Sequence, residues 1–291
     1  MDDNKLYNAL LKSQEEQKRK DGDLERLTDQ RRDPGPDQKS RSDRYRTSWR
    51  NFTTHDDDRI PTVYDASVSL GLIANPRPWS REQLRKRKII YPGMSDKAVM
   101  DAYREIRILL RNRARTPGFT VMVSSLGLER NSLLTSFNLA VAFAMDSHTS
   151  ALLVDCDPYN RELQDLVSSD LDAGVTDFVA DPSLSVKKIL YPSGVDRLTV
   201  IPAGYQVSSA VELFASVRMR ELMTELRERY PDRCIVVNAP PFRASTEARI
   251  LERFCDQVVF SVPFGEVSGD DVAEAVEALG SDKFTGLVFQ E

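Results

Sequence analysis

The sequence contains no apolar run approaching the roughly 20 residues that a membrane-spanning helix requires. Its N-terminus, MDDNKLYNALLKSQ, is polar and lacks the apolar core of a signal peptide. We therefore expect a cytoplasmic protein with no transmembrane segment of its own.

Side chains typical of metal and redox sites are scarce. The three cysteines, Cys156, Cys234 and Cys255, form no CxxC pair, and each lies in or beside an apolar segment. We expect small, buried core residues of a reducing compartment. The two histidines, His55 and His148, lie far apart in polar stretches, and we expect both at the surface.

Excess positive charge is also missing. The net charge of -5 over 291 residues gives no electrostatic reason to expect a nucleic-acid partner. Charged residues make up 29% and hydrophobic residues 41% of the chain, which is ordinary for a soluble protein with a sizeable core.

Residues 1–60 have few large apolar side chains and carry 14 basic and 14 acidic residues. This composition, with the loop-like stretch RRDPGPDQKS, predicts a mostly disordered N-terminal segment. One exception is a candidate helix from Leu6 to about Lys20, in which Leu6, Tyr7, Leu10 and Leu11 share one face. It is either a transient helix without a role or a docking helix for a partner.

Residues 61–94 contain scattered apolar residues and several prolines, which predict an extended connector lying over a folded domain. From Ser95 the pattern becomes helical. Val99, Tyr103, Ile106 and Leu110 recur at helical spacing and are expected to form its buried face.

Residues 95–291 are predicted to form one α/β domain. Apolar stretches without polar alternation predict strands, and amphipathic stretches between them predict helices, as in a doubly wound, mostly parallel sheet. The strands are expected at 120–124, 151–155, 198–204, 234–238, 257–262 and 285–290, and the later helices at 132–146, 216–229, 245–254 and 268–279. Ligands of such sheets bind beyond the carboxyl ends of the strands, here 125–132, 155–160, 204–209 and 238–243.

The turn after the first strand stands where a phosphate-binding loop would be. A working loop needs glycines for the backbone to wrap phosphate, a lysine to neutralise it and a hydroxyl to hold Mg²⁺. Residues 123–140 instead read VSSLGLERNSLLTSFNLA.

This stretch resembles VTSAxPGEGKSTTAANLA of the cytoplasmic bacterial tyrosine autokinases of capsule and exopolysaccharide export, which are relatives of the septum-site and partition ATPases. Three further segments resemble the same family in order. ALLVDCDPYNREL (151–163) is similar to LLVDADLRRPxL, the stretch from LTVIPAG (198–204) to about residue 230 is similar to LYVLPAG followed by RMxxLL, and IVVNAPPF (235–242) is similar to IIVDTPPV. The resemblance covers about residues 95–291 and implies a sheet of the P-loop NTPase type.

Residue by residue, the resemblance implies a degenerate nucleotide site. The family's two glycines fall on Glu129 and Asn131, its lysine on Ser132, its Ser/Thr on Leu133 and the acid of its Walker B strand on Asn238. With the loop residues Ser125 and Arg130, these positions form the candidate cofactor site for ATP or ADP.

Two acids of the family pattern remain, Asp155 and Asp157, which in the family help to hold Mg²⁺. They are either a magnesium site here or inherited strand-end residues that cap the next turn. Because several electrostatic contacts to phosphate are missing, we expect no catalytic residue and no efficient turnover. The alternative is that Arg130 replaces the lysine as a phosphate contact.

Self-association is a second implication of the resemblance. The family's ring-forming helix carries Glu-x2-Arg-x2-Arg, which Asp101, Arg104 and Arg107 match apart from Asp for Glu. The alternative is a solvated charged face. The family's tyrosine-rich tail has no counterpart after Gln290-Glu291, so no acceptor for self-phosphorylation is expected.

Three functional hypotheses follow. The first is a non-catalytic or weakly nucleotide-binding subunit that regulates or scaffolds exopolysaccharide synthesis and export, held at the inner membrane through a polysaccharide co-polymerase or chain-length protein. The second is an active ATPase or tyrosine kinase with an atypical loop. The third is a positioning protein of the partition-ATPase type. The LPAG and RMxxL segments favour the polysaccharide branch.

Overall fold

The computed structural model describes residues 75–128, 132–146, 149–205, 208, 210–229 and 233–290. Several predictions fall outside these ranges: residues 1–60 with the Leu6–Lys20 helix, the start of the connector, both histidines, and the loop residues Glu129, Arg130 and Asn131. Within the described ranges, no helix is both long enough and apolar enough to cross a membrane.

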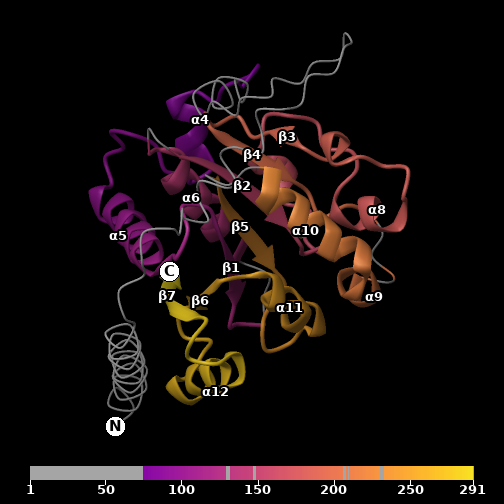
Figure 1. Cartoon of the computed structure of the whole chain (residues 1–291). Helices are drawn as coiled ribbons and strands as arrows, with labels where there is room; N and C mark the ends of the chain where they lie inside the picture. The colour runs from indigo at the N-terminus through magenta and orange to yellow at the C-terminus, as the bar shows by residue number, and fades with distance from the viewer. Residues whose placement is uncertain are drawn as a thin grey trace, which may run out of the picture. The chain divides into compact units, whose positions relative to one another are not determined.

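A seven-stranded sheet forms the centre of the domain, in the order β3-β4-β2-β5-β1-β6-β7 (Figure 1). Every neighbouring pair is parallel except β3 and β4. The strands are β1 (Phe119–Ser125), β2 (Ser150–Asp155), β3 (Tyr191–Pro192), β4 (Leu198–Ile201), β5 (Arg233–Ala239), β6 (Gln257–Pro263) and β7 (Phe284–Gln290). The prediction of a mostly parallel α/β sheet is confirmed.

Helices cover both faces of this sheet, so the fold is doubly wound (Figure 1). In chain order they are α4 (Arg81–Lys86), α5 (Lys97–Arg113), α6 (Ser132–Ala144), α7 (Leu163–Leu166), α8 (Val175–Ala180), α9 (Ala210–Ala215), α10 (Val217–Arg229), α11 (Thr246–Leu251) and α12 (Gly269–Leu279). Short 3-10 turns occupy Val186–Lys188 and Glu252–Phe254. One core lies under α5 and α6, and the other under α8 to α12. Adjacent residues of β1 enter different cores, Val121 the first and Met122 the second, which is why its sequence is continuously apolar.

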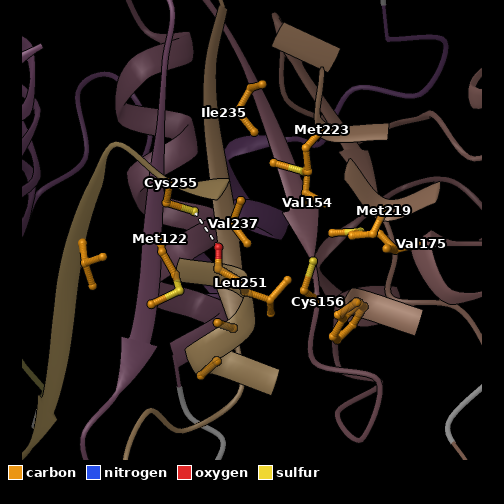
Figure 2. Close-up of a cluster of buried hydrophobic side chains, with 14 of the residues drawn as sticks. Met122, Val154, Cys156, Val175, Met219, Met223, Ile235, Val237, Leu251 and Cys255 are labelled. Atoms are coloured by element: carbon orange, nitrogen blue, oxygen red, sulfur yellow. Dashed lines mark hydrogen bonds between the residues drawn. The ribbon is translucent and has the colours of Figure 1, made fainter. Parts of the chain in front are cut away.

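Two of the three cysteines belong to the core beneath α8 to α12. Figure 2 shows Cys156 and Cys255 among methionine and aliphatic side chains of β1, β2, β5 and the covering helices. The Cys255 Sγ lies 3.5 Å from the carbonyl oxygen of Leu251. Burial raises the pKa of all three thiols, so they stay protonated and unreactive at neutral pH. The prediction of buried core cysteines is confirmed.

The connector that precedes α5 is not extended throughout. It contains α4, whose start is closed by a reciprocal capping box between Ser80 and Gln83. The Trp79 indole Nε1 donates to the carbonyl of Leu166 at 3.1 Å, and the Arg87 guanidinium stacks 3.8 Å above the Trp79 ring. These contacts bind the connector to the folded domain.

A single amide fixes the end of this connector onto α6. The Asn138 side chain accepts a hydrogen bond from the Ile90 N–H at 3.0 Å and donates to the Lys88 carbonyl at 3.0 Å. Lys88 has a φ of 56°, in the left-handed region that side chains rarely adopt. The turn allows Ile89 and Ile90 to enter the core beside α6, where both are buried.

Some helix details differ from the prediction. Asp96 caps α5, which therefore begins at Lys97, and Val99 is 40% exposed while Met100 is buried instead. The prediction for Val99 was wrong because the buried face of the helix contains Met100 in its place. The short elements α8, α9 and β3 were not predicted, since two to six residues carry too little periodicity to be recognised.

We predict that Asn138→Ala lowers the free energy of unfolding by about 2–4 kcal/mol, because it leaves a buried N–H and a carbonyl without partners. Urea denaturation measures the difference. The matched control is Asn112→Ala at an exposed position of α5, which should change the stability by less than about 1 kcal/mol. Equal effects of the two substitutions would contradict the role of the Asn138 amide.

Candidate functional site

The loop after β1 is attached to the ends of the neighbouring strands. The Leu126 N–H donates to the Ser261 carbonyl at 2.9 Å, and the Phe242 N–H donates to the Ser125 carbonyl at 2.9 Å. The Ser125 hydroxyl accepts from the Gly127 N–H at 3.1 Å. The backbone between Ser125 and Gly127 is therefore held by protein groups at the carboxyl edge of the sheet.

Gly127 lies against the end of β6. A Cβ atom at this position would stand 2.6 Å from Cγ of Pro263 and 2.7 Å from the Glu266 carboxylate. Pro263 is the last residue of β6, and its ring cannot rotate away. The close approach therefore requires glycine at position 127. Leu128, the next residue, is 76% exposed.

A hydrogen bond joins Ser132 and Asn238, the two residues that the resemblance matches to the family lysine and the family Walker B acid. Ser132 opens α6, and its hydroxyl donates to Oδ1 of Asn238, on β5, at 2.9 Å. The Ser136 hydroxyl, one turn further along α6, lies 2.9 Å from the same oxygen. All three side chains are buried. The side-chain oxygen of Asn238 therefore lies within hydrogen-bonding distance of two hydroxyl groups of the protein itself.

The same asparagine connects onward to β2. Its Nδ2 donates to Oδ1 of Asp155 at 2.8 Å, which follows from the register that sets Asp155 beside Asn238. The Asp157 N–H donates to the same carboxylate oxygen at 3.1 Å. Burial raises the pKa of Asp155 to about 7, against the lowering effect of these two hydrogen bonds. Burial therefore favours the protonated form of this carboxyl.

The resemblance matches Leu133 to the family Ser/Thr, whose hydroxyl binds Mg²⁺. Its side chain is buried in the core beneath α5 and α6, together with Phe137 and Ile90. It has no oxygen to offer a cation, and hard cations such as Mg²⁺ need oxygen ligands.

Asp157 belongs to a second polar group at the same edge of the sheet. Its Oδ1 accepts from the Tyr159 N–H at 3.2 Å. The Tyr159 hydroxyl donates to Glu247 at 2.8 Å, and the Ser245 hydroxyl donates to the other oxygen of Glu247 at 2.8 Å. Glu247 could not be recognised as a site residue from the sequence, because a single glutamate in the first turn of a helix has no distinguishing pattern. In the described part of the chain, no three His, Cys, Asp or Glu side chains are grouped as they would be to hold a metal ion.

The three residues matched to the ring-forming helix make different contacts. Asp101 and Arg104 form an exposed ion pair at 2.9 Å on α5. Arg107 instead donates to the carbonyl of Ala142 on α6 at 2.8 Å, within its own domain. Asp101 and Arg104 are exposed and Arg107 is half-buried, and the part of all three in an oligomer stays a prediction.

Part of the chain is similar in sequence to known proteins. No protein-family profile matches the chain. Tyrosine-protein kinase YwqD of Bacillus subtilis is 27% identical over 164 residues, which are 56% of this chain and 68% of that protein. Tyrosine-protein kinase CpsD of Streptococcus pneumoniae is 24% identical over 170 residues, 58% of this chain and 72% of that protein. Over more than half of its length, this chain is therefore similar in sequence to proteins named as bacterial tyrosine kinases.

Solved structures of bacterial tyrosine kinases show the same fold. The kinase domain of Escherichia coli tyrosine kinase ETK matches with a TM-score of 0.61 and 21% identity, covering 74% of this chain and 88% of that one. The chimerical protein CapA2B2 matches with a TM-score of 0.61 and 18% identity, covering 77% and 98%. The P-loop NTPase fold implied by the sequence resemblance is thereby confirmed. The nucleotide and metal roles of individual residues stay predictions.

We predict that Asp155→Asn stabilises the fold increasingly as the pH rises from about 4 to 8. The folded-state pKa of Asp155 is raised from 3.8 to about 7, so ionisation between these values favours the unfolded chain. The wild-type protein should lose up to about 4 kcal/mol relative to the variant over this range, at roughly 1.4 kcal/mol per pKa unit. Urea denaturation at pH 4, 6 and 8 measures the difference.

The control is Asn112→Ala at an exposed position of α5, which removes no titratable group, so the difference from wild type should be nearly independent of pH. If Asp155→Asn also gives a constant difference, Asp155 is ionised in the folded protein throughout.

Proposed function

We propose that this chain is a non-catalytic or weakly nucleotide-binding relative of the bacterial tyrosine kinases, which regulates or scaffolds exopolysaccharide or capsule synthesis and export. The observation that carries the proposal is the hydrogen-bonded series from Ser132 through Asn238 to Asp155. The sequence resemblance matches Ser132 and Asn238 of this series to the lysine and the acid that a working P-loop directs at phosphate and Mg²⁺.

Electrostatics support the proposal that this chain is non-catalytic. Phosphoryl transfer depends almost entirely on positive charge placed against the transferring phosphate, and one arginine finger alone is worth about 10³–10⁵ in rate. Ser132 is neutral, Asn238 is neutral, and Leu133 is apolar and buried. Asp155 is buried, and its carboxylate already accepts hydrogen bonds from the Asn238 amide and the Asp157 N–H. Three of the four usual contacts are therefore missing, and the fourth is hydrogen-bonded within the protein.

The sequence resemblance supports the pathway and the partner. The family works with inner-membrane polysaccharide co-polymerases, so the proposed partner is a chain-length protein of that type, which would hold this chain at the membrane surface. The proposed organisation is an N-terminal segment (1–60), a connector (61–94) and an α/β domain (95–291). The exposed Asp101–Arg104 pair is the proposed contact for self-association.

The second candidate is an active ATPase or tyrosine kinase, which the similarity to proteins named as tyrosine kinases favours. It requires a phosphate contact from outside the described residues, and Arg130 is the residue of the loop that offers one. Arginine binds phosphate well, so this candidate makes a specific prediction about that side chain.

Calorimetry with ATP and ADP in the presence of Mg²⁺ distinguishes the two candidates. We expect no binding to the wild-type chain below millimolar nucleotide, and no change in Arg130→Ala. Micromolar binding that is lost in Arg130→Ala would establish the second candidate instead. The positive control is a variant that restores the family residues: Glu129→Gly, Asn131→Gly, Ser132→Lys, Leu133→Thr and Asn238→Asp. If this folded variant binds nucleotide, the measurement can detect a working site.

In cells, we predict that Asp155→Ala and Arg130→Ala each leave polysaccharide export within about twofold of wild type, while deletion of the whole chain impairs it. The reason is that a scaffold needs its folded surface but not turnover at the old site. Polysaccharide yield and chain length measure the effect, with protein abundance as the control for destabilisation. Loss of export in Arg130→Ala at normal abundance would contradict a purely structural role.

A further inference from the structure

A cluster of positive charge lies on the connector that precedes α5. Residues 77–88 contain six basic residues and one acidic residue, in a chain whose net charge is -5. Five of the six basic side chains are exposed, at α4 and on either side of it. These five, which we call the α4 cluster, are Arg77, Arg81, Arg85, Lys86 and Lys88. The connector therefore concentrates positive charge that the chain as a whole does not have.

The α4 cluster is held on the folded domain. The Trp79 N–H donates to the Gly194 carbonyl at 2.9 Å. Arg87, the sixth basic residue, donates to the carbonyl of Asp165 at 2.7 Å and stacks on the Trp79 ring. Leu84 packs from α4 against the core beneath α5 and α6. The five exposed cations are therefore presented on a fixed part of the domain surface.

No described carboxylate pairs with the α4 cluster. None of its five side chains forms an ion pair or a hydrogen bond with another described residue. Two exposed acids are close by, Glu82 on α4 and Asp165 beside Arg87. Because the cations outnumber these acids, the cluster has an excess of positive charge that is available to an anionic partner.

The α4 cluster is better suited to an extended anionic surface than to a single anion. A site for one carboxylate or phosphate holds its donors in place through further hydrogen bonds, and these five side chains have none among the described residues. Nucleic-acid binding uses aromatic stacking or an element that enters a groove. Trp79 is covered by Arg87, and α4 is only six residues long. A bilayer with anionic lipids requires only several Lys or Arg side chains close to its surface.

We propose that the α4 cluster binds the surface of a membrane that contains anionic phospholipids. The contact is electrostatic, because Leu84, the one apolar residue of α4, packs on the core and does not insert between lipids. The inference rests on the proposed function only in placing the chain at a membrane. There, a direct lipid contact adds to the contact with the proposed protein partner, and the two strengthen each other.

Co-sedimentation of the full chain with lipid vesicles tests the proposal. Wild type should bind vesicles of phosphatidylcholine mixed with phosphatidylglycerol and should not bind phosphatidylcholine alone. About 0.5 M NaCl should release it, because salt screens exposed charges. A triple variant should weaken binding at least about tenfold, because each Lys or Arg near the surface contributes to the attraction. Its changes are Arg81→Ala, Arg85→Ala and Lys86→Ala.

A matched control removes three exposed cations on the other side of the sheet, where Val186 and Met219 belong to the core beneath α8 to α12. Its changes are Lys187→Ala, Lys188→Ala and Arg220→Ala. It alters the net charge equally and should bind vesicles within about twofold of wild type. Thermal unfolding checks that both variants are folded. The vesicles contain no protein, so the result is independent of the proposed protein partner and of nucleotide binding.

Three results would overturn the proposal: no binding of the wild type to the anionic vesicles, equal losses in the two triple variants, or binding that persists in about 0.5 M NaCl. Binding of a single-stranded oligonucleotide through the α4 cluster, without binding of vesicles, would assign the cluster to nucleic acid instead.

Discussion

The hydrogen bond between the Asn238 amide and the Asp155 carboxyl is the interaction on which the rest of the site depends. It joins the two central strands that would face a nucleotide, and it leaves the amide oxygen of Asn238 to accept hydroxyls from α6. An aspartate at position 238 would replace the N–H donor by a second negative charge against a carboxyl that is already desolvated. The neutral amide therefore donates a hydrogen bond to the buried acid of β2, where an aspartate would repel it.

Burial of both sheet faces explains how much of the fold could be predicted. A strand covered on two sides must be continuously apolar, so β1, β2, β5 and β6 could be located within a residue or two at each end. The elements that were missed are short, and their positions depend on contacts distant in sequence. The Asn138 clamp is the clearest case, because nothing in the sequence indicates that an amide within a helix will hold Lys88 and Ile90, which lie about 50 residues earlier.

The candidate site could be predicted in part. Alignment to the family pattern placed Ser132 and Asn238 at the functional positions, and the structure adds that these two side chains bind each other. A residue-by-residue comparison identifies what is missing at each position, but not what the remaining groups do together. Arg107 illustrates the same limit, because the match to a ring-forming pattern does not indicate that its guanidinium is bound to Ala142 of the same domain.

On the proposed function, these contacts also explain why no single substitution is expected to restore a working loop. A lysine at position 132 alone would lose the hydroxyl that donates to Asn238, and its charge would face a neutral amide rather than a second carboxylate. An aspartate at position 238 alone would lack the cation that a P-loop provides. Each change is unfavourable until the other is present, since the two positions share one hydrogen bond. The hydrogen bond that couples Ser132 to Asn238 would therefore oppose each single step toward the family residues.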